Sequence, residues 1–125
     1  MKNNETWDDR FDLMNKPYLR YGVIIVDAAP FNIGVDSADA VILVSTPGGA
    51  LTLPLAASKP HAAYYIKKVA AGADAEIFRS GADLIDGSAL PLALPLQYDA
   101  VLLVSDGLTN WYVLSKSSAA VLPVT

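Results

Sequence analysis

The chain has no cysteine and only one histidine, His61. The absence of cysteine excludes disulfide bonds, thiolate zinc sites and a cysteine nucleophile. A histidine-based metal site or catalytic triad needs partner residues in a recognisable pattern, and none surrounds His61. Because it follows Pro60, we expect His61 to be a loop residue or a contact between subunits, where it would respond to pH at a symmetry axis. We predict no enzyme activity, no metal and no cofactor.

Charge is also scarce, at 18% of 125 residues, and the net charge is −4. Nucleic-acid binding requires clustered Lys and Arg, so a nucleic-acid partner is not expected. The chain holds nine basic and thirteen acidic residues, and eight of these lie within residues 1–20. The remainder is sparsely charged for a small monomer, whose surface is usually about a quarter charged. We therefore expect much of its surface to face other subunits.

Long apolar runs are missing as well. No run approaches the roughly 18 to 20 residues that a membrane helix needs, so no membrane partner is expected. The N-terminus, MKNNETWDDR, has no signal-peptide core, which favours a soluble protein used without secretion. With 53% apolar residues, the chain can bury one hydrophobic core.

Residues 1–20 differ in kind from the rest and predict an N-terminal arm, extended or in a short helix. Three apolar side chains recur there at helical spacing before Pro17 stops the pattern: Trp7, Phe11 and Met14. A helix of about two turns is not stable alone in water. The arm must therefore dock on its own body, on a neighbouring subunit or on a foreign surface.

Residues 21–125 predict one all-β domain, an antiparallel β-sandwich or a barrel-like fold. Short apolar runs are separated by Gly, Pro and Asp turns, with no helical periodicity over three turns. The expected strands cover residues 23–26, 41–45, 50–55 as an edge strand, 62–69, 75–79 and 119–124.

Two Asp-Gly turns organise the C-terminal part. Asp106-Gly107 lies between the apolar runs 100–105 and 110–115, which predicts a β-hairpin. Asp86-Gly87 makes a similar turn ahead of a third run, 88–96, so we expect a three-strand meander. Asp tolerates the left-handed backbone of such turns and Gly adopts it without a Cβ clash. Asp83 and Asp86 are therefore interpreted as turn residues rather than calcium ligands.

The aromatic side chains have two interpretations. Trp111 and Tyr112 are adjacent in a strand and must point to opposite faces, and so must Lys67 and Lys68, which therefore form no basic patch. Strand aromatics usually fill a core or an interface. The alternative is a platform on which sugars stack, formed by Tyr64, Tyr65, Tyr98, Trp111 and Tyr112.

Residues 40–115 resemble a β domain of tailed-bacteriophage virion proteins, found in tail fibres, head fibres and capsid-decorating proteins. That domain reads TLPAA, then Y-x-IKK, then D-x-IDG, and ends in a block of the form SDG-NWYV. The matching positions here are Thr52, Leu53, Pro54, Ala56, Ala57, Tyr65, Ile66, Lys67, Lys68, Ile85, Asp86, Gly87, Leu92, Leu94, Tyr98, Val101, Leu103, Ser105, Asp106, Gly107, Asn110, Trp111, Tyr112 and Val113. The chain departs from the pattern at Pro91 and Pro95, which interrupt a strand, and at Leu108, an insertion beside the last turn.

The resemblance implies a homotrimeric virion structural protein, made in the host cytoplasm, without enzyme activity. The chain lacks the long shaft and receptor-binding head of a full fibre, which favours a capsid decoration (cement) protein on the outer surface of the head. The major capsid protein is then the partner, with the arm as anchor through Trp7, Phe11 and Met14 and with Arg10 and Arg20 pairing to capsid carboxylates. The alternative is a short head, tail or collar fibre module that binds a host receptor or glycan.

Overall fold

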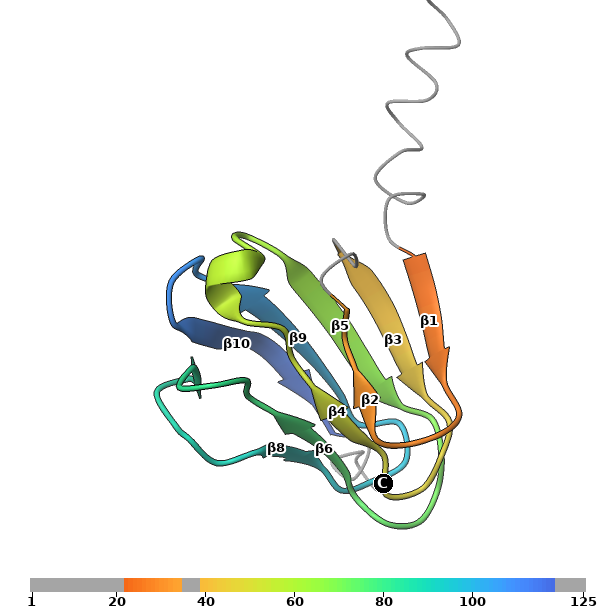
Figure 1. Ribbon diagram of the computed structural model, residues 1–125. Coiled ribbons are helices and arrows are strands. Elements are labelled where there is room, and N and C mark those ends of the chain that lie inside the picture. Colours follow the sequence, from red (N-terminus) through yellow and green to blue (C-terminus); the bar gives the residue numbers. More distant parts are fainter. Residues whose placement is uncertain (1–21, 35–38, 119–125) are drawn as a thin grey trace, which may run out of the picture.

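The computed structural model describes residues 22–34 and 39–118 (Figure 1). Over these residues the protein is all-β, with strands in two sheets and a single 3-10 turn, η1, as the only helical segment. The elements are β1 (Gly22–Val26), β2 (Phe31–Asn32), β3 (Ala40–Val44), β4 (Ala50–Thr52), η1 (Ala56–Ser58), β5 (Ala63–Lys68), β6 (Ala75–Phe78), β7 (Leu84–Ile85), β8 (Leu92–Leu94), β9 (Ala100–Ser105) and β10 (Asn110–Ser117).

The first six strands form a parallel, solenoid-like coil. The chain alternates between a six-stranded sheet of order β1-β3-β5-β9-β10-β7 and a four-stranded sheet of order β2-β4-β6-β8. Within this coil β1, β3 and β5 lie side by side and run parallel, as do β2, β4 and β6. Figure 1 shows the smaller sheet in front of the larger one, with the strands of each turn of the coil on opposite layers.

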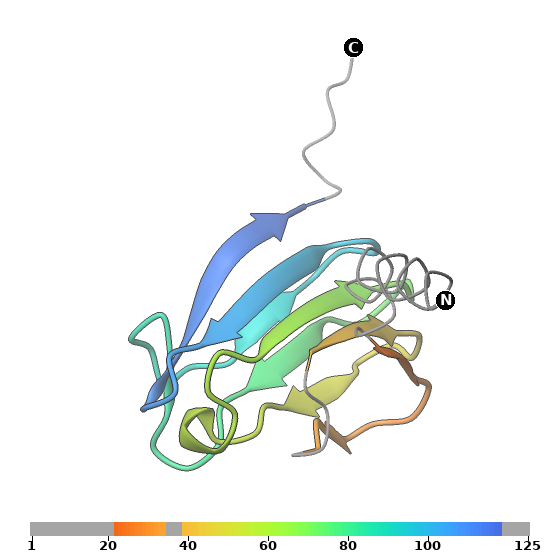
Figure 2. The same cartoon turned by 90° about the horizontal axis from the view of Figure 1, so that it is seen from above.

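The last strands reverse direction and end the coil. β8 is antiparallel to β6, and β9 is antiparallel to both β5 and β10. Figure 2 shows β10, β9, β5, β3 and β1 side by side, from blue through green to orange. The predicted hairpin at Asp106-Gly107 is confirmed, since it joins β9 to β10.

Three of the expectations on strand pairing are wrong. The sheets are mixed rather than antiparallel, because the coil pairs successive turns in parallel. The run 88–96 does not join β9 and β10 in a meander: Pro91 and Pro95 have no N–H to donate and flank β8, which pairs with β6 in the other sheet. The run 50–55 is no edge strand, because β4 ends at Thr52 and lies between β2 and β6.

The core lies between the two sheets, and every second residue of a strand contributes to it. Along β3 the buried residues Ala40, Ile42 and Val44 alternate with the half-buried Val41 and Leu43. Such alternation places one set of side chains between the sheets and the other on the outside. The largest fully buried side chains are Trp111, Tyr64, Lys68, Ile42, Leu51, Leu53, Ile66, Ile77, Leu94 and Leu103.

The predicted arm, with Trp7, Arg10, Phe11, Met14 and Arg20, lies outside the described residues, as does the strand expected at 119–124.

Candidate functional site

The two Asp-Gly motifs are backbone turns whose carboxylates bind main-chain N–H groups. Asp106 Oδ1 accepts hydrogen bonds from the N–H groups of Leu108, Thr109 and Asn110 at 2.7, 3.1 and 3.0 Å. These bonds lower the pKa of Asp106 below its usual 3.8, and the bond from the Asn110 N–H has the largest effect. Gly107 has a φ of 78°, the left-handed conformation that glycine adopts without strain. Leu108 is thus part of an ordered turn.

Asp86 connects its turn to β10, the second strand of the hairpin. Its Oδ1 accepts the N–H of Val113 at 3.0 Å, while its own backbone has a φ of 49° next to Gly87 at 79°. β7, just before this turn, lies parallel to β10. The turn interpretation of Asp86 and Gly87 is therefore confirmed, with the added role of fixing β7 against β10.

Trp111 joins three parts of the chain inside the core. Its indole Nε1–H donates to the carbonyl of Pro54 at 3.1 Å, and its ring stacks on Tyr64 with centroids 5.3 Å apart. Burial of Tyr64, followed by the negative charge of Asp39, raises the pKa of this phenol from 10.0 to about 12. Tyr112, the next residue, is exposed, so the prediction of opposite faces is confirmed.

A second buried junction lies at η1. The N–H of Ala56 donates to Asp83 Oδ2 at 2.7 Å, and the Ala56 carbonyl accepts from Ser105 Oγ at 2.9 Å. Asp83 is therefore more than a turn former, because it binds a backbone group far away in sequence. Three of the four sequence blocks of the resemblance (TLPAA, D-x-IDG and SDG-NWYV) thus meet through hydrogen bonds to backbone atoms, which is an architectural use of their polar side chains.

Lys68 is fully buried, which the sequence pattern did not reveal. Its Nζ donates to the carbonyls of Gly72 and Pro95 at 3.0 and 3.4 Å and so joins two loops. Lys67 lies on the other side of β5, with its Nζ 5.7 Å from the centre of the Tyr98 ring. The prediction that the two lysines face opposite ways is confirmed.

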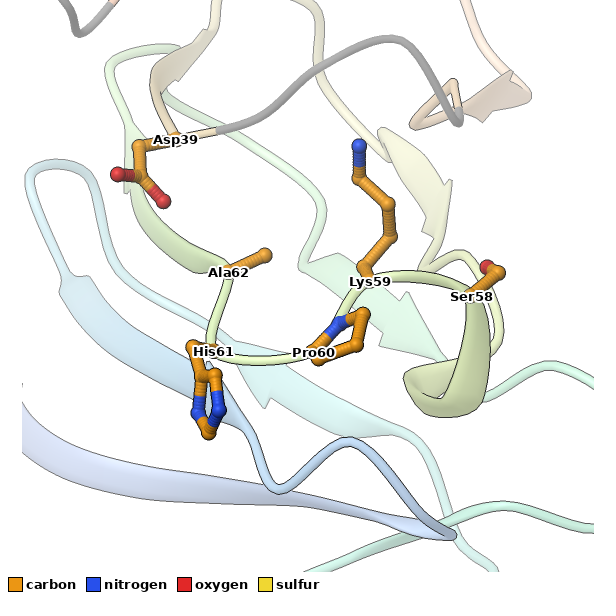
Figure 3. Close-up of a pocket in the computed structure, with 6 residues that line it drawn as sticks. All are labelled: Asp39, Ser58, Lys59, Pro60, His61 and Ala62. Carbon is orange, nitrogen blue, oxygen red and sulfur yellow. The ribbon is translucent and has the colours of Figure 1, made fainter.

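His61 lies in a loop, as expected, beside an open pocket of about 270 Å³ (Figure 3). The pocket is also lined by Asp39, Ser58 and Lys59, but Figure 3 shows the His61 ring directed away from the carboxylate of Asp39. Ser58 Oγ donates to the Leu55 carbonyl, and Asp39 Oδ1 accepts the N–H of Ala63. The polar groups thus do not converge on a reacting atom. Within residues 22–34 and 39–118, no group of three or more His, Asp or Glu could hold a metal ion.

The most extensive feature is the outer face of the six-stranded sheet. We use this name for the side chains that point away from the core along five adjacent strands: Val23, Ile25, Val41, Leu43, Ala63, Tyr65, Lys67, Leu102, Val104, Tyr112, Ser115 and Ser117. Register places Val23 beside Val41, Val41 beside Tyr65, and Tyr65 beside Leu102, so one apolar row crosses four strands. The outer face carries a single charge, that of Lys67.

The outer face is both exposed and hollowed. Val23 and Ile25 are each 62% exposed, and Tyr65 and Tyr112 are 48% and 43% exposed. An apolar hollow of about 310 Å³ is lined by Val41, Ala63, Tyr65 and Leu102, together with Ala40. Single exposed apolar residues are ordinary, but a contiguous patch of this kind marks an interaction site. The outer face is therefore the candidate functional site.

Among the described strands, β1 forms one edge of the outer face. Of these strands it pairs only with β3, and its sequence Gly-Val-Ile-Ile-Val contains no charge and no proline. Natural edge strands are usually blunted by such residues, because open backbone groups invite pairing with another chain.

No protein-family model matches the chain, and no curated protein matches its sequence. In the described part of the chain, no helix is long and apolar enough to cross a membrane.

Proposed function

We propose that the chain is a structural protein of a tailed-bacteriophage virion. In this proposal it is a non-enzymatic capsid decoration protein, a homotrimer that binds the outside of the head through its N-terminal arm. Its body is a sandwich-like pair of sheets that needs no cofactor. The observation that carries the proposal is that two sets of side chains in the body have different roles. The polar residues of the resemblance bind backbone groups and so hold the fold together, whereas the outer face presents apolar side chains.

The proposed mechanism is mechanical. Each copy buries apolar surface against neighbouring capsid subunits, and buried apolar surface contributes about 25 cal/mol per Å² before the costs of association. Many copies on one lattice add these contacts with little further entropic cost, because attachment of one subunit holds the others nearby. Expansion of the shell would then have to break those contacts.

Immunogold electron microscopy of intact virions, with an antibody against this chain, tests the location. Label spread evenly over the head is expected. Label confined to the tail tip or collar would contradict decoration, and absence of label from every particle would contradict a virion protein altogether.

The anchor is tested by adding the full-length chain to heads that lack it. Phe11→Asp is expected to abolish attachment, because it places a charge in the apolar stripe of the arm. Leu90→Asp is the matched control, since Leu90 is 73% exposed in the loop before β8. Equal attachment of the two variants would contradict the anchor.

A second candidate function is glycan binding by a fibre module. The exposure of Tyr65 and Tyr112 on one face favours it, because sugars stack on open aromatic rings. A glycan array on which the chain binds, and on which Tyr65→Ala does not, would support this candidate. A blank array would contradict it.

A further inference from the structure

We propose that the outer face of the six-stranded sheet packs against the outer faces of other copies of this chain. The inference deepens the homotrimer of the proposed function by assigning the surface that holds it together. It concerns the purified protein alone, so its test does not depend on a capsid.

The dimensions of the outer face favour a sheet as its occupant over the protein's own arm. The outer face crosses β1, β3, β5, β9 and β10, and four strand spacings of about 4.8 Å give a width of about 19 Å. A helix is about 10 Å across including its side chains, so one short helix would cover about half of that width. In a ring of three copies, the sheets of the two neighbouring copies can together cover this width, each at the usual separation of about 10 Å from the part that it contacts.

The charge pattern favours a second copy over an unrelated protein. The outer face carries one ammonium, Lys67, and no carboxylate, so two identical faces can approach with little repulsion. An unrelated polar surface would leave its own charged groups desolvated against Val41, Tyr65 and Leu102. Eight of the 22 charged residues of this chain lie within residues 1–20, ahead of β1 in the sequence. Another copy's outer face is thus the matching surface that the chain itself supplies.

The outer face has both a hollow and protruding side chains, which can be complementary between two copies. Val23 lies beside Val41, which lines the hollow next to Tyr65, and the side chains of Ile25 and Tyr112 are exposed elsewhere on the same face. In a head-to-tail ring each copy offers one part of its outer face to the copy before it and another part to the copy after it. The side chains that protrude from one part can then fill the hollow in the other.

The test measures the mass of the full-length chain by light scattering after size-exclusion chromatography. The parent chain is expected at about three times its 13.2 kDa, and Ile25→Glu and Tyr65→Glu at 13.2 kDa, a threefold fall. Leu90→Glu introduces the same charge at an exposed site off the outer face and should keep the parent mass. Circular dichroism checks that each variant keeps its β structure.

A monomeric parent chain would overturn the inference, and so would face variants that keep the parent mass. If Phe11→Glu alone produced a monomer, the arm and not the outer face would hold the copies together. A trimer that fails to label phage heads would overturn the proposed function and leave this inference standing. A parent chain that is monomeric but labels heads evenly would overturn this inference and leave the decoration function standing.

A second measurement covers the case in which the charged variants fold poorly. Because the chain has no cysteine, Tyr65→Cys and Leu90→Cys each introduce one thiol. We expect a maleimide reagent to modify the thiol at 65 at least tenfold more slowly than the thiol at 90, and dilution to monomer to remove the difference. Equal rates in the undiluted protein would overturn the inference.

Discussion

The two faces of β5 are built from similar side chains but differ in what covers them. The residues between the sheets are Tyr64, Ile66 and Lys68, and those on the outer face are Ala63, Tyr65 and Lys67. The phenol of Tyr64 stacks on Trp111 and the ammonium of Lys68 donates to two carbonyls, whereas Tyr65 is 48% exposed. Composition alone therefore does not separate a buried face from an exposed one; the packing and hydrogen bonds of the inner face do.

The largest contrast is expected between neighbours on β10. Trp111→Ala removes a fully buried ring and its bond to the Pro54 carbonyl, so we expect it to lower the free energy of unfolding by about 3–5 kcal/mol. Tyr112→Ala is the matched control, and should cost under about 1 kcal/mol when the chain is monomeric. Urea denaturation at low protein concentration measures both. Equal losses would mean that the outer face is already packed within a single chain.

Local signals made the turns and the facing of Trp111 and Tyr112 predictable. Asp106-Gly107 determines the backbone of a turn only a few residues long, and the alternation of side chains in a strand depends on adjacent positions only. The parallel coil was not predictable in this way, because β1, β3 and β5 are joined through the other sheet and no short motif specifies that pairing. The prediction for the run 88–96 was wrong for the same reason, because its apolar pattern fits a strand of either sheet. Pro91 and Pro95 limit the length of β8 but do not determine which strand it pairs with.

The outer face was only partly visible in the sequence. Scarce charge predicted a surface that other subunits cover. The residues of the outer face, which we propose for that role, come from strands far apart in the chain. Lys68 shows the converse difficulty. Lysine is rarely buried, and its donation to Gly72 and Pro95 depends on loops that no pattern places beside it.

A smaller contrast is expected between the two lysines. Lys68→Met keeps the length of the side chain but removes the donor to the Gly72 and Pro95 carbonyls, and should cost about 1–3 kcal/mol. Lys67→Met loses only the contact with the Tyr98 ring, worth about 0.5–1 kcal/mol. The same urea titration measures both variants. A neutral or stabilising Lys68→Met would show that the cost of burying the ammonium offsets its hydrogen bonds.

The contrast between Tyr64 and Tyr65 is expected only at alkaline pH. The pKa of Tyr64 is about 12 in the folded protein and 10.0 without the surrounding structure. The unfolded chain therefore loses this proton first as the pH rises. The associated stability is complete below pH 10 and is lost progressively as the pH rises toward 12.

Tyr64→Phe removes the ionisable group, so its stability relative to the parent chain should rise between pH 10 and 12. Tyr65→Phe removes a hydroxyl from the outer face and leaves Tyr64 in place, so it should keep the alkaline loss of the parent. Urea denaturation in steps across this range measures the difference, and comparison with the parent cancels the other groups that titrate there. If Tyr64→Phe followed the parent curve throughout, the inner face would be open enough to hydrate a phenolate. The distinction between the two faces would then lie in hydrogen bonding alone and not in the exclusion of water.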